Sequence, residues 1–183
     1  MARITLAITG SIAAYKAVDL VSSLKKQGHS VTVLMTKAAT AFIQPLTLQV
    51  LSQNTVHLDV MHEPFPDQVN HIQIGKETDL FIVVPATANT IAKLAHGFAD
   101  NMVTATALAL PHFVPKLLAP AMNTKMYDHP ATQANLKTLE DYGYTIISPK
   151  DSLLACGDTG RGALADLETI LLEIKDKIHE QTL

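Results

Sequence analysis

Residues 79–97 of the chain read DLFIVVPATANTIAKLAHG. The run from Leu80 to Val84 is continuously apolar and rich in β-branched residues, which is typical of a strand covered on both faces in the middle of a parallel sheet. Pro85 has no N–H group to donate, so we expect the strand to stop there. The small and hydroxyl residues that follow predict a short polar loop and then a helix that ends before Gly97.

A strand, a polar loop and a helix start in this order predict a crevice at the carboxyl edge of a sheet. Open α/β sheets bind their ligands at this edge. The free N–H groups of the helix start favour an anion, usually a phosphate. Thr87 and Asn89 fit a purely structural role as helix N-caps equally well, so the loop alone supports both interpretations.

Composition limits the class of protein. The 183 residues are 48% hydrophobic, which predicts one domain, residues 1–183, with a sizeable core. A net charge of -3 without basic runs argues against nucleic-acid partners and against an anionic membrane surface. The apolar region 102–122 is interrupted by prolines, so no membrane span is expected, and the first strand leaves no room for a signal peptide. The single cysteine favours a cytoplasmic location, and no Cys/His spacing predicts a metal site.

The amino-terminal third reads as a strand–turn–helix–strand unit, the usual start of a nucleotide-binding fold. We expect strands over Ile4–Ile8 and Ser30–Met35, and between them a helix over Ala13–Gln27 closed by Gly28. The dinucleotide fingerprint needs three glycines, and only Gly10 is present here. A mononucleotide with one phosphate is therefore the better prediction, while the alternative is that Gly10 only permits a tight turn.

The remaining elements are predicted from the periodicity of apolar residues and from the glycines and prolines that interrupt it. We expect helical segments at 38–52, 102–110, 130–142 and from 166 to the end, strands at 116–119 and 144–147, an exposed loop at 59–68 and a polar loop at 121–127.

Two residues stand out as chemical candidates. His71 follows the exposed loop, and an imidazole near the edge of the sheet can act as a general base, although a surface or capping role is the commoner one. Cys156 lies in the glycine-rich segment 153–162, which predicts a mobile lid that brings a thiol to the site. The alternative for Cys156 is a small buried hydrophobic residue.

Five motifs occur in an order that resembles the homo-oligomeric flavin-containing cysteine decarboxylases. They are GSIAAYK at 10–16, NH at 70–71, PATANT at 85–90, GFADN at 97–101 and PAMNTKM at 120–126. The resemblance spans nearly the whole chain. It implies the α/β class, as a three-layer Rossmann-like (flavodoxin-like) parallel sheet with helices on both faces, binding FMN in a homotrimer or a multiple of trimers with the cofactor between subunits.

The resemblance also implies roles for particular residues. His71 would be the catalytic base, and Cys156 would lie on the lid over the substrate. Asn123 would hold the substrate carboxylate, and Met126 would line the site. The FMN contacts would be Gly10, Ser11, Ile12, Thr36, Thr87, Ala88, Asn89, Thr90 and Ala121.

The reaction that the resemblance implies is the FMN-dependent decarboxylation of 4'-phosphopantothenoylcysteine to 4'-phosphopantetheine in coenzyme A biosynthesis. Oxidation of the thiol-bearing carbon to a thioaldehyde provides an electron sink, so that carbon dioxide can leave. His71 would assist the proton removal. Cys156 would protonate the resulting enethiolate while reduced FMN returns the two electrons, which gives the saturated thiol and regenerates FMN. The alternatives are a peptidyl-cysteine oxidative decarboxylase, which does not need the lid cysteine, and a flavin-binding regulatory subunit without catalysis.

The chain departs from the family pattern at three positions. Thr87 replaces the usual serine and keeps the hydroxyl group. Tyr127 replaces a tryptophan, and we expect it to preserve an aromatic wall of the site. The arginine usual near residues 163–164 is absent, and whether Arg161 replaces it is open.

Overall fold

The computed structural model describes residues 1–64, 66–154 and 157–180. Its centre is a parallel sheet of six strands in the order β3-β2-β1-β4-β5-β6. The strands are β1 (Arg3–Ile8), β2 (Ser30–Met35), β3 (Val56–His57), β4 (Leu80–Ala86), β5 (Lys116–Pro120) and β6 (Tyr144–Ile146). The strand order reverses between β1 and β4, which is where doubly wound sheets open a ligand crevice.

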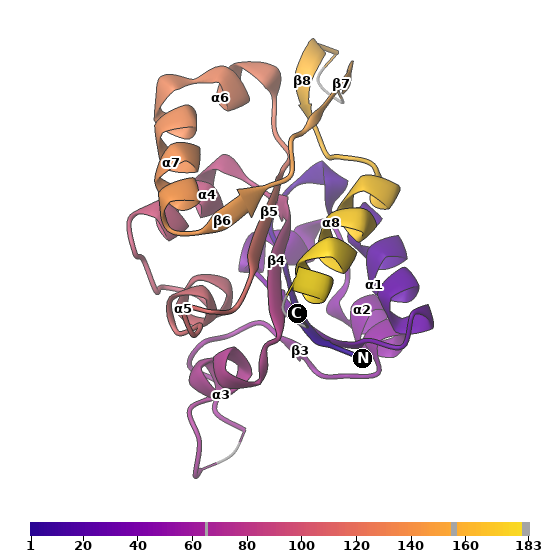
Figure 1. Cartoon of the computed structure of the whole chain (residues 1–183), viewed down its shortest axis with the longest axis vertical. Helices are drawn as coiled ribbons and strands as arrows, with labels where there is room; N and C mark the ends of the chain where they lie inside the picture. Colours follow the sequence, from indigo (N-terminus) through magenta and orange to yellow (C-terminus); the bar gives the residue numbers. More distant parts are fainter. Residues whose placement is uncertain (65, 155–156, 181–183) are drawn as a thin grey trace.

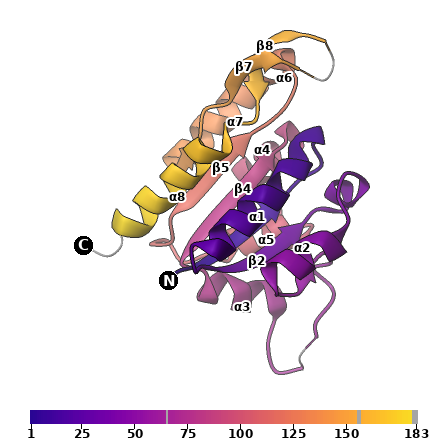
Figure 2. The same cartoon turned by 90° about the vertical axis from the view of Figure 1, so that its right-hand side faces the viewer.

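Helices cover both faces of the sheet (Figure 1). On one face lie α1 (Lys16–Lys26), α2 (Pro45–Ser52) and α8 (Leu167–Glu180); on the other lie α3 (Asn70–Glu77), α4 (Ala88–Ala95), α5 (Met102–Leu108) and α7 (Pro130–Asp141). The turned view of Figure 2 shows α1 and α8 lying on the same side of the sheet. The predicted three-layer α/β class is therefore confirmed. Within the described residues, no helix combines the length and apolar character that crossing a membrane requires.

The alternation of side chains along the strands divides the core in two. Leu6 and Ile82 face the cluster under α1 and α8, whereas Ala7 and Val83 face the cluster under α4 and α5. All residues of β4 are buried. This agrees with the prediction that a continuous apolar run forms a strand covered on both faces.

Local signals located several element ends correctly. Gly28, Gly97 and Gly143 follow helices with φ of 85°, 69° and 83°, the left-handed conformation that glycine adopts without strain. The predicted helix from Ala13 is instead divided into a 3-10 turn, η1 (Ile12–Tyr15), followed by α1. The two-residue strand β3 was not predicted, because it is too short to show periodicity.

The prediction that Pro85 ends its strand is wrong. β4 runs on to Ala86, and its pairing with β5 shifts register between Val83 and Ala86. The ladder resumes where the N–H group of Ala121 donates to the carbonyl of Ala86 at 3.0 Å. Pro85 supplies no N–H group to β5, and the register shift places it where none is needed.

The glycine-rich segment is not an irregular loop in its described part. Antiparallel strands β7 (Lys150–Leu153) and β8 (Thr159–Ala163) form a hairpin. A Cβ atom on Gly162 would lie 2.3 Å from the carbonyl oxygen of Met122, and one on Gly160 would lie 2.9 Å from Cγ2 of Thr124. These two glycines therefore permit close packing of the hairpin, and the role of the segment as a lid stays a prediction.

Helix α3 is fixed to the rest of the fold at its carboxyl end. The hydroxyl of Thr78 donates to the carbonyl of Ile74 at 2.6 Å and lies 2.6 Å from the hydroxyl of Thr5 in β1. Because Thr78 has only one hydroxyl hydrogen, Thr5 must donate to it. A Cβ atom on Gly75 would lie 3.1 Å from the carbonyl oxygen of Ala109, so α3 also packs closely against the end of α5.

We predict that Thr78→Val lowers the free energy of unfolding by about 1–3 kcal/mol, because it leaves the buried hydroxyl of Thr5 and the carbonyl of Ile74 without these partners. Urea unfolding of the variant measures the loss. The matched variant Thr5→Val should cost less, since the bond from Thr78 to Ile74 remains. Equal stability of Thr78→Val and the wild type would contradict the anchoring role.

Candidate functional site

Thr9 joins the two strands at the reversal of strand order. Its fully buried hydroxyl donates to the carbonyl of Pro85 at 2.6 Å and accepts from the backbone N–H of Thr87 at 3.0 Å. Thr9 directly follows β1, and Thr87 directly follows β4. The bond pair fixes the two loops to each other. The sequence predicts only that Thr9 lies in the turn after the first strand, and the one signal for this bridging role is a hydroxyl directly after an apolar strand.

Three neighbouring strands are each followed by a hydroxyl residue that caps a helix. Ser11 accepts from the N–H of Ala13 after β1, Thr36 from that of Ala39 after β2, and Thr87 from that of Thr90 after β4, each at 3.3 Å. Because these strands are adjacent in the sheet, the three helix starts lie along one edge. Their remaining N–H groups favour an anion there.

The first turn of α4 carries the other predicted residues of this loop. Thr90 is buried and its hydroxyl accepts from that of Thr87 at 3.2 Å, while Ala88 is half-buried and Asn89 is exposed. Thr87 is therefore the N-cap, and Asn89 is not. The structure thus confirms the capping role that the sequence allowed for Thr87, and this role is compatible with ligand binding.

The space around Gly10 is too small for any side chain. A Cβ atom at this position would lie 2.5 Å from Cβ of Ala38, which belongs to the 3-10 helix η2 (Lys37–Ala41). Gly10 is not one of the described glycines that have a positive φ. The glycine therefore serves the close approach of the loops after β1 and β2, rather than a left-handed turn.

A pocket of about 200 Å³ lies between three segments that are far apart in the sequence. Its lining residues are Ser11, Ile12, Ala13, Ala121, Met122, Asn123, Leu154 and Gly162. The hydroxyl of Ser11 donates to the carbonyl of Ala121 at 3.4 Å, and the N–H of Met122 donates to the carbonyl of Gly162 at 2.9 Å. Four predicted site residues thus meet here: Ser11, Ile12, Ala121 and Asn123.

The amide of Asn123 connects this pocket to the hairpin. Its oxygen accepts from the N–H of Lys125 at 2.9 Å and caps the short helix α6 (Thr124–Asp128), which was predicted as a loop. Its nitrogen donates to the carboxylate of Asp158 at 2.7 Å. Asp158 was not predicted. The amide that we expected to hold a substrate carboxylate therefore holds a carboxylate of the hairpin in this structure.

The other residues near this region lie in different surroundings. Met126 is 50% exposed and does not line the pocket. Tyr127 is buried in the core beside α7, where burial raises the pKa of its phenol, so the predicted aromatic wall of the site is not formed by this residue. Arg161 is exposed on β8 opposite Asp151. Cys156 lies outside the described residues.

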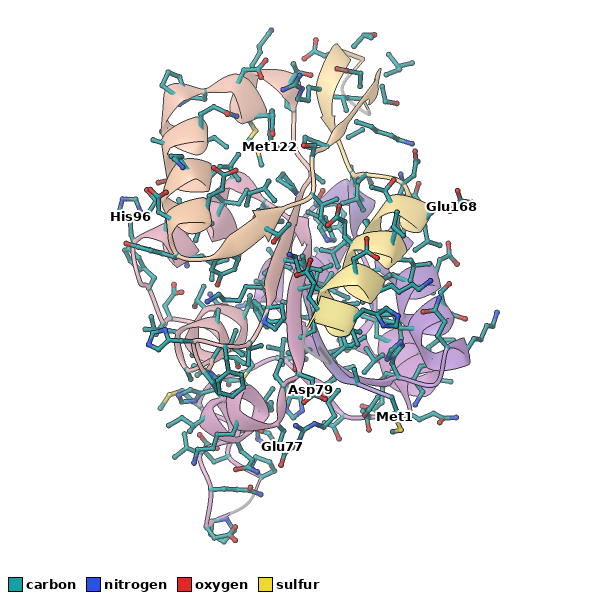
Figure 3. The ribbon with its side chains drawn as sticks, viewed as in Figure 1. Met1, Glu77, Asp79, His96, Met122 and Glu168 are labelled. Carbon is teal, nitrogen blue, oxygen red and sulfur yellow. The ribbon has the colours of Figure 1, made fainter. Side chains whose placement is uncertain are left out.

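His71 is not brought to this pocket within one chain. It lies in the first turn of α3, is half-buried, and its Nδ1 atom is buried without a hydrogen-bond partner in the described part of the chain. Figure 3 shows Glu77, at the end of α3, and Met122 toward opposite ends of the molecule. Both cartoons likewise place α3 and the α6–hairpin region far apart (Figures 1 and 2).

A larger cavity, of about 630 Å³, lies beside the amino ends of β5 and β6. The ammonium group of Lys116 lies 5.6 Å from the ring centre of Tyr144 there, and burial lowers the pKa of this ammonium group. None of the predicted site residues that the structure describes lines this cavity. We therefore place the candidate site at the carboxyl edge, where the helix starts and the smaller pocket are.

A doubly wound parallel sheet with capped helix starts at its carboxyl edge defines a flavodoxin-like α/β protein. A family model described as Flavoprotein matches residues 1–179, and the chain belongs to this family. The predicted resemblance is thereby confirmed.

Sequence relatives agree with this assignment. The chain is 60% identical over 176 residues to a probable phosphopantothenoylcysteine decarboxylase of Streptococcus mutans, covering 96% of this chain and 98% of the relative. It is 44% identical over 179 residues to the coenzyme A biosynthesis bifunctional protein CoaBC of Bacillus subtilis. The matched region is 98% of this chain and only 44% of that longer protein.

Solved structures share the fold. A mutant PPC decarboxylase complexed with pantothenoylaminoethenethiol is 32% identical with a TM-score of 0.86, covering 95% of this chain and 96% of the other. The FMN-dependent cysteine decarboxylase SpaF is 28% identical with a TM-score of 0.85, covering 100% and 98%.

We predict that Gly10→Ala destabilises the fold by about 1–3 kcal/mol, because the new methyl group meets Ala38 and the loops after β1 and β2 must separate. Thermal unfolding measures this loss. Adding Ala38→Gly to the same chain removes the opposing methyl group and should restore at least half of the lost stability. Failure of this second substitution to restore any stability would contradict the close-approach explanation.

Proposed function

We propose that this chain catalyses the FMN-dependent decarboxylation of 4'-phosphopantothenoylcysteine to 4'-phosphopantetheine, a step of coenzyme A biosynthesis. The observation that carries the proposal is the 60% identity, over nearly the whole of both chains, to a probable phosphopantothenoylcysteine decarboxylase. The fold neighbour complexed with pantothenoylaminoethenethiol supports the same substrate class. The carboxyl-edge pocket offers a place for such a substrate.

The carboxyl edge fits a flavin mononucleotide. Three capped helix starts favour its phosphate, and Ile12, which is 61% exposed at the lip of the pocket, offers apolar surface to a flat ring. The residues that would hold FMN are Gly10, Ser11, Ile12, Thr36, Thr87, Ala88, Asn89, Thr90 and Ala121. The pocket of about 200 Å³ is smaller than the roughly 300–1,000 Å³ of most small-molecule sites, so FMN would extend beyond it.

When bound, FMN would supply the two-electron oxidation that gives the departing carboxylate an electron sink. The amide nitrogen of Asn123 would hold the substrate carboxylate, and it already donates to the carboxylate of Asp158. Two carboxylates at one amide repel each other, so the arrival of substrate would weaken the contact between Asn123 and Asp158 of the hairpin. Met126 would approach the substrate from α6.

His71 would accept a proton during the oxidation. Because α3 and the pocket lie toward opposite ends of the folded molecule (Figure 3), we propose that a neighbouring copy supplies His71 to each pocket. A homotrimer, or a multiple of trimers, with FMN between subunits would meet this need. The pocket of one chain, at about 200 Å³, is too small to enclose FMN, which supports the same arrangement.

Further expectations from the sequence remain proposals. We propose that residues 1–183 form a single domain and that the protein is cytoplasmic. We also propose that Cys156 protonates the decarboxylated intermediate while reduced FMN would return the two electrons. A peptidyl-cysteine oxidative decarboxylase is the second candidate, because the peptidyl-cysteine decarboxylase EpiD shares the fold with a TM-score of 0.77. The higher sequence identity to the coenzyme A enzyme favours the small substrate. A regulatory subunit without catalysis is the third.

The mass of the product distinguishes these candidates. We expect the purified protein to be yellow and to convert phosphopantothenoylcysteine to a product that has lost carbon dioxide alone. Mass spectrometry of the reaction measures this. Loss of carbon dioxide together with two hydrogens would indicate an oxidative decarboxylase, and no reaction by the flavin-loaded protein would contradict the proposal.

Two variants should separate the half-reactions. His71→Asn should lower carbon dioxide release by about 100-fold or more while leaving the protein yellow, because it removes the base and not the FMN contacts. Cys156→Ser should still release carbon dioxide but accumulate the enethiol and leave reduced flavin, since the final proton donor is lost. Released carbon dioxide, flavin absorbance and product mass are the measurements. Normal product from Cys156→Ser would exclude the role of this thiol.

A further inference from the structure

Helix α3, which carries His71, has a second anchor at its amino end. The amide nitrogen of Asn70 lies 3.0 Å from Nδ1 of His57, the last residue of β3. The backbone N–H of Asn70 donates to a carboxylate oxygen of Glu63 at 2.7 Å. Asn70 is the first residue of α3 and directly precedes His71.

The N-terminal contacts of Asn70 matter because α3 has no conventional cap. Its N-cap residue, Val69, offers no side chain that can accept from the first turn. Glu63 satisfies the first N–H group instead, and His57 ties the side chain of the same residue to the sheet. Without these contacts the first turn of a helix of this length would fray.

The protonation state of His57 suits it to accept this bond. Burial, and the neighbouring His62, lower the pKa of its imidazole, so the ring is neutral at pH 7 and one ring nitrogen is an acceptor. With the amide nitrogen of Asn70 facing Nδ1, the ring proton resides on Nε2. His57, Asn70 and Glu63 come from β3, α3 and the loop between them.

We propose that Asn70 and His57 are positioning residues that fix the orientation of the imidazole of His71. This inference rests on the proposed function, since it assigns the pair to the base of that reaction. The side chain of His71 has no hydrogen bond of its own at Nδ1 within the described residues, so its place depends on the backbone of the first turn. The Thr5–Thr78 bond holds the other end of α3, and Asn70 holds the end where His71 lies.

A double-mutant cycle on the FMN-loaded enzyme tests the pair. Asn70→Ala removes the donor and His57→Leu removes the acceptor with little change in volume. We expect each to lower kcat for carbon dioxide release about ten-fold, with KM and flavin content unchanged. Because the two substitutions break the same hydrogen bond, kcat of the double variant should also fall about ten-fold, whereas independent effects would lower it roughly hundred-fold. His57→Gln, which keeps an acceptor, should recover part of the loss.

Gln73→Ala is the matched control on the same helix. Gln73 donates to Glu77 through an exposed side-chain bond, so its loss should change kcat by less than two-fold. Unchanged kcat in both single variants, multiplicative losses in the double variant, or losses explained by missing flavin would each overturn the proposal.

A measurement that does not need turnover separates this inference from the proposed function. We expect the imidazole NMR signal of His71, assigned by its absence in His71→Asn, to shift or broaden in Asn70→Ala and His57→Leu but not in Gln73→Ala. An unmoved signal would overturn the positioning role. If the wild type releases no carbon dioxide, the proposed function fails, and the NMR result still decides whether the pair orients His71.

Discussion

The buried hydroxyl of Thr9 fixes the point at which the sheet reverses its strand order. It donates to the strand containing Pro85 and accepts from the N–H of Thr87, so the loops after β1 and β4 move as one unit. A ligand in the crevice of a doubly wound sheet contacts both loops. Their separation must therefore be set before a ligand binds, and a hydroxyl with one donor and two acceptor positions can bridge them.

Close backbone approach gives the site its shape. Gly10 lets the loop after β1 meet η2, and Gly162 lets the hairpin meet the carbonyl of Met122. At both positions a side chain would force segments apart that are distant in sequence. These glycines are therefore needed because they lack a side chain, which allows the two backbones to approach closely. Their conformational flexibility is not required for this packing.

Several local features were predictable from particular residues. The strand at Ser30–Met35 was located at both ends. Asp100 and Asn101 were both candidate caps for the helix that follows them, and in the structure Asn101 caps α5. The motif order identified the family, and four of the predicted contact residues line one pocket. The end of β4 and the bonds of Thr9 and Asp158 were missed, because each depends on a partner far away along the chain. The hairpin is local, and it was missed because its glycine-rich sequence is typical of a loop.

The sequence alone specifies what depends on near neighbours: buried runs, helix caps, glycine ends and an ordered set of motifs. The meeting of Ser11 with Ala121, the bond from Asn123 to Asp158 and the distance of α3 from the pocket follow only from the folded chain. Periodicity and capping act over a few residues, whereas these contacts arise from strand order and from the packing of elements more than thirty residues apart. For this reason the residue types of the site are readable in the sequence, and their grouping is not.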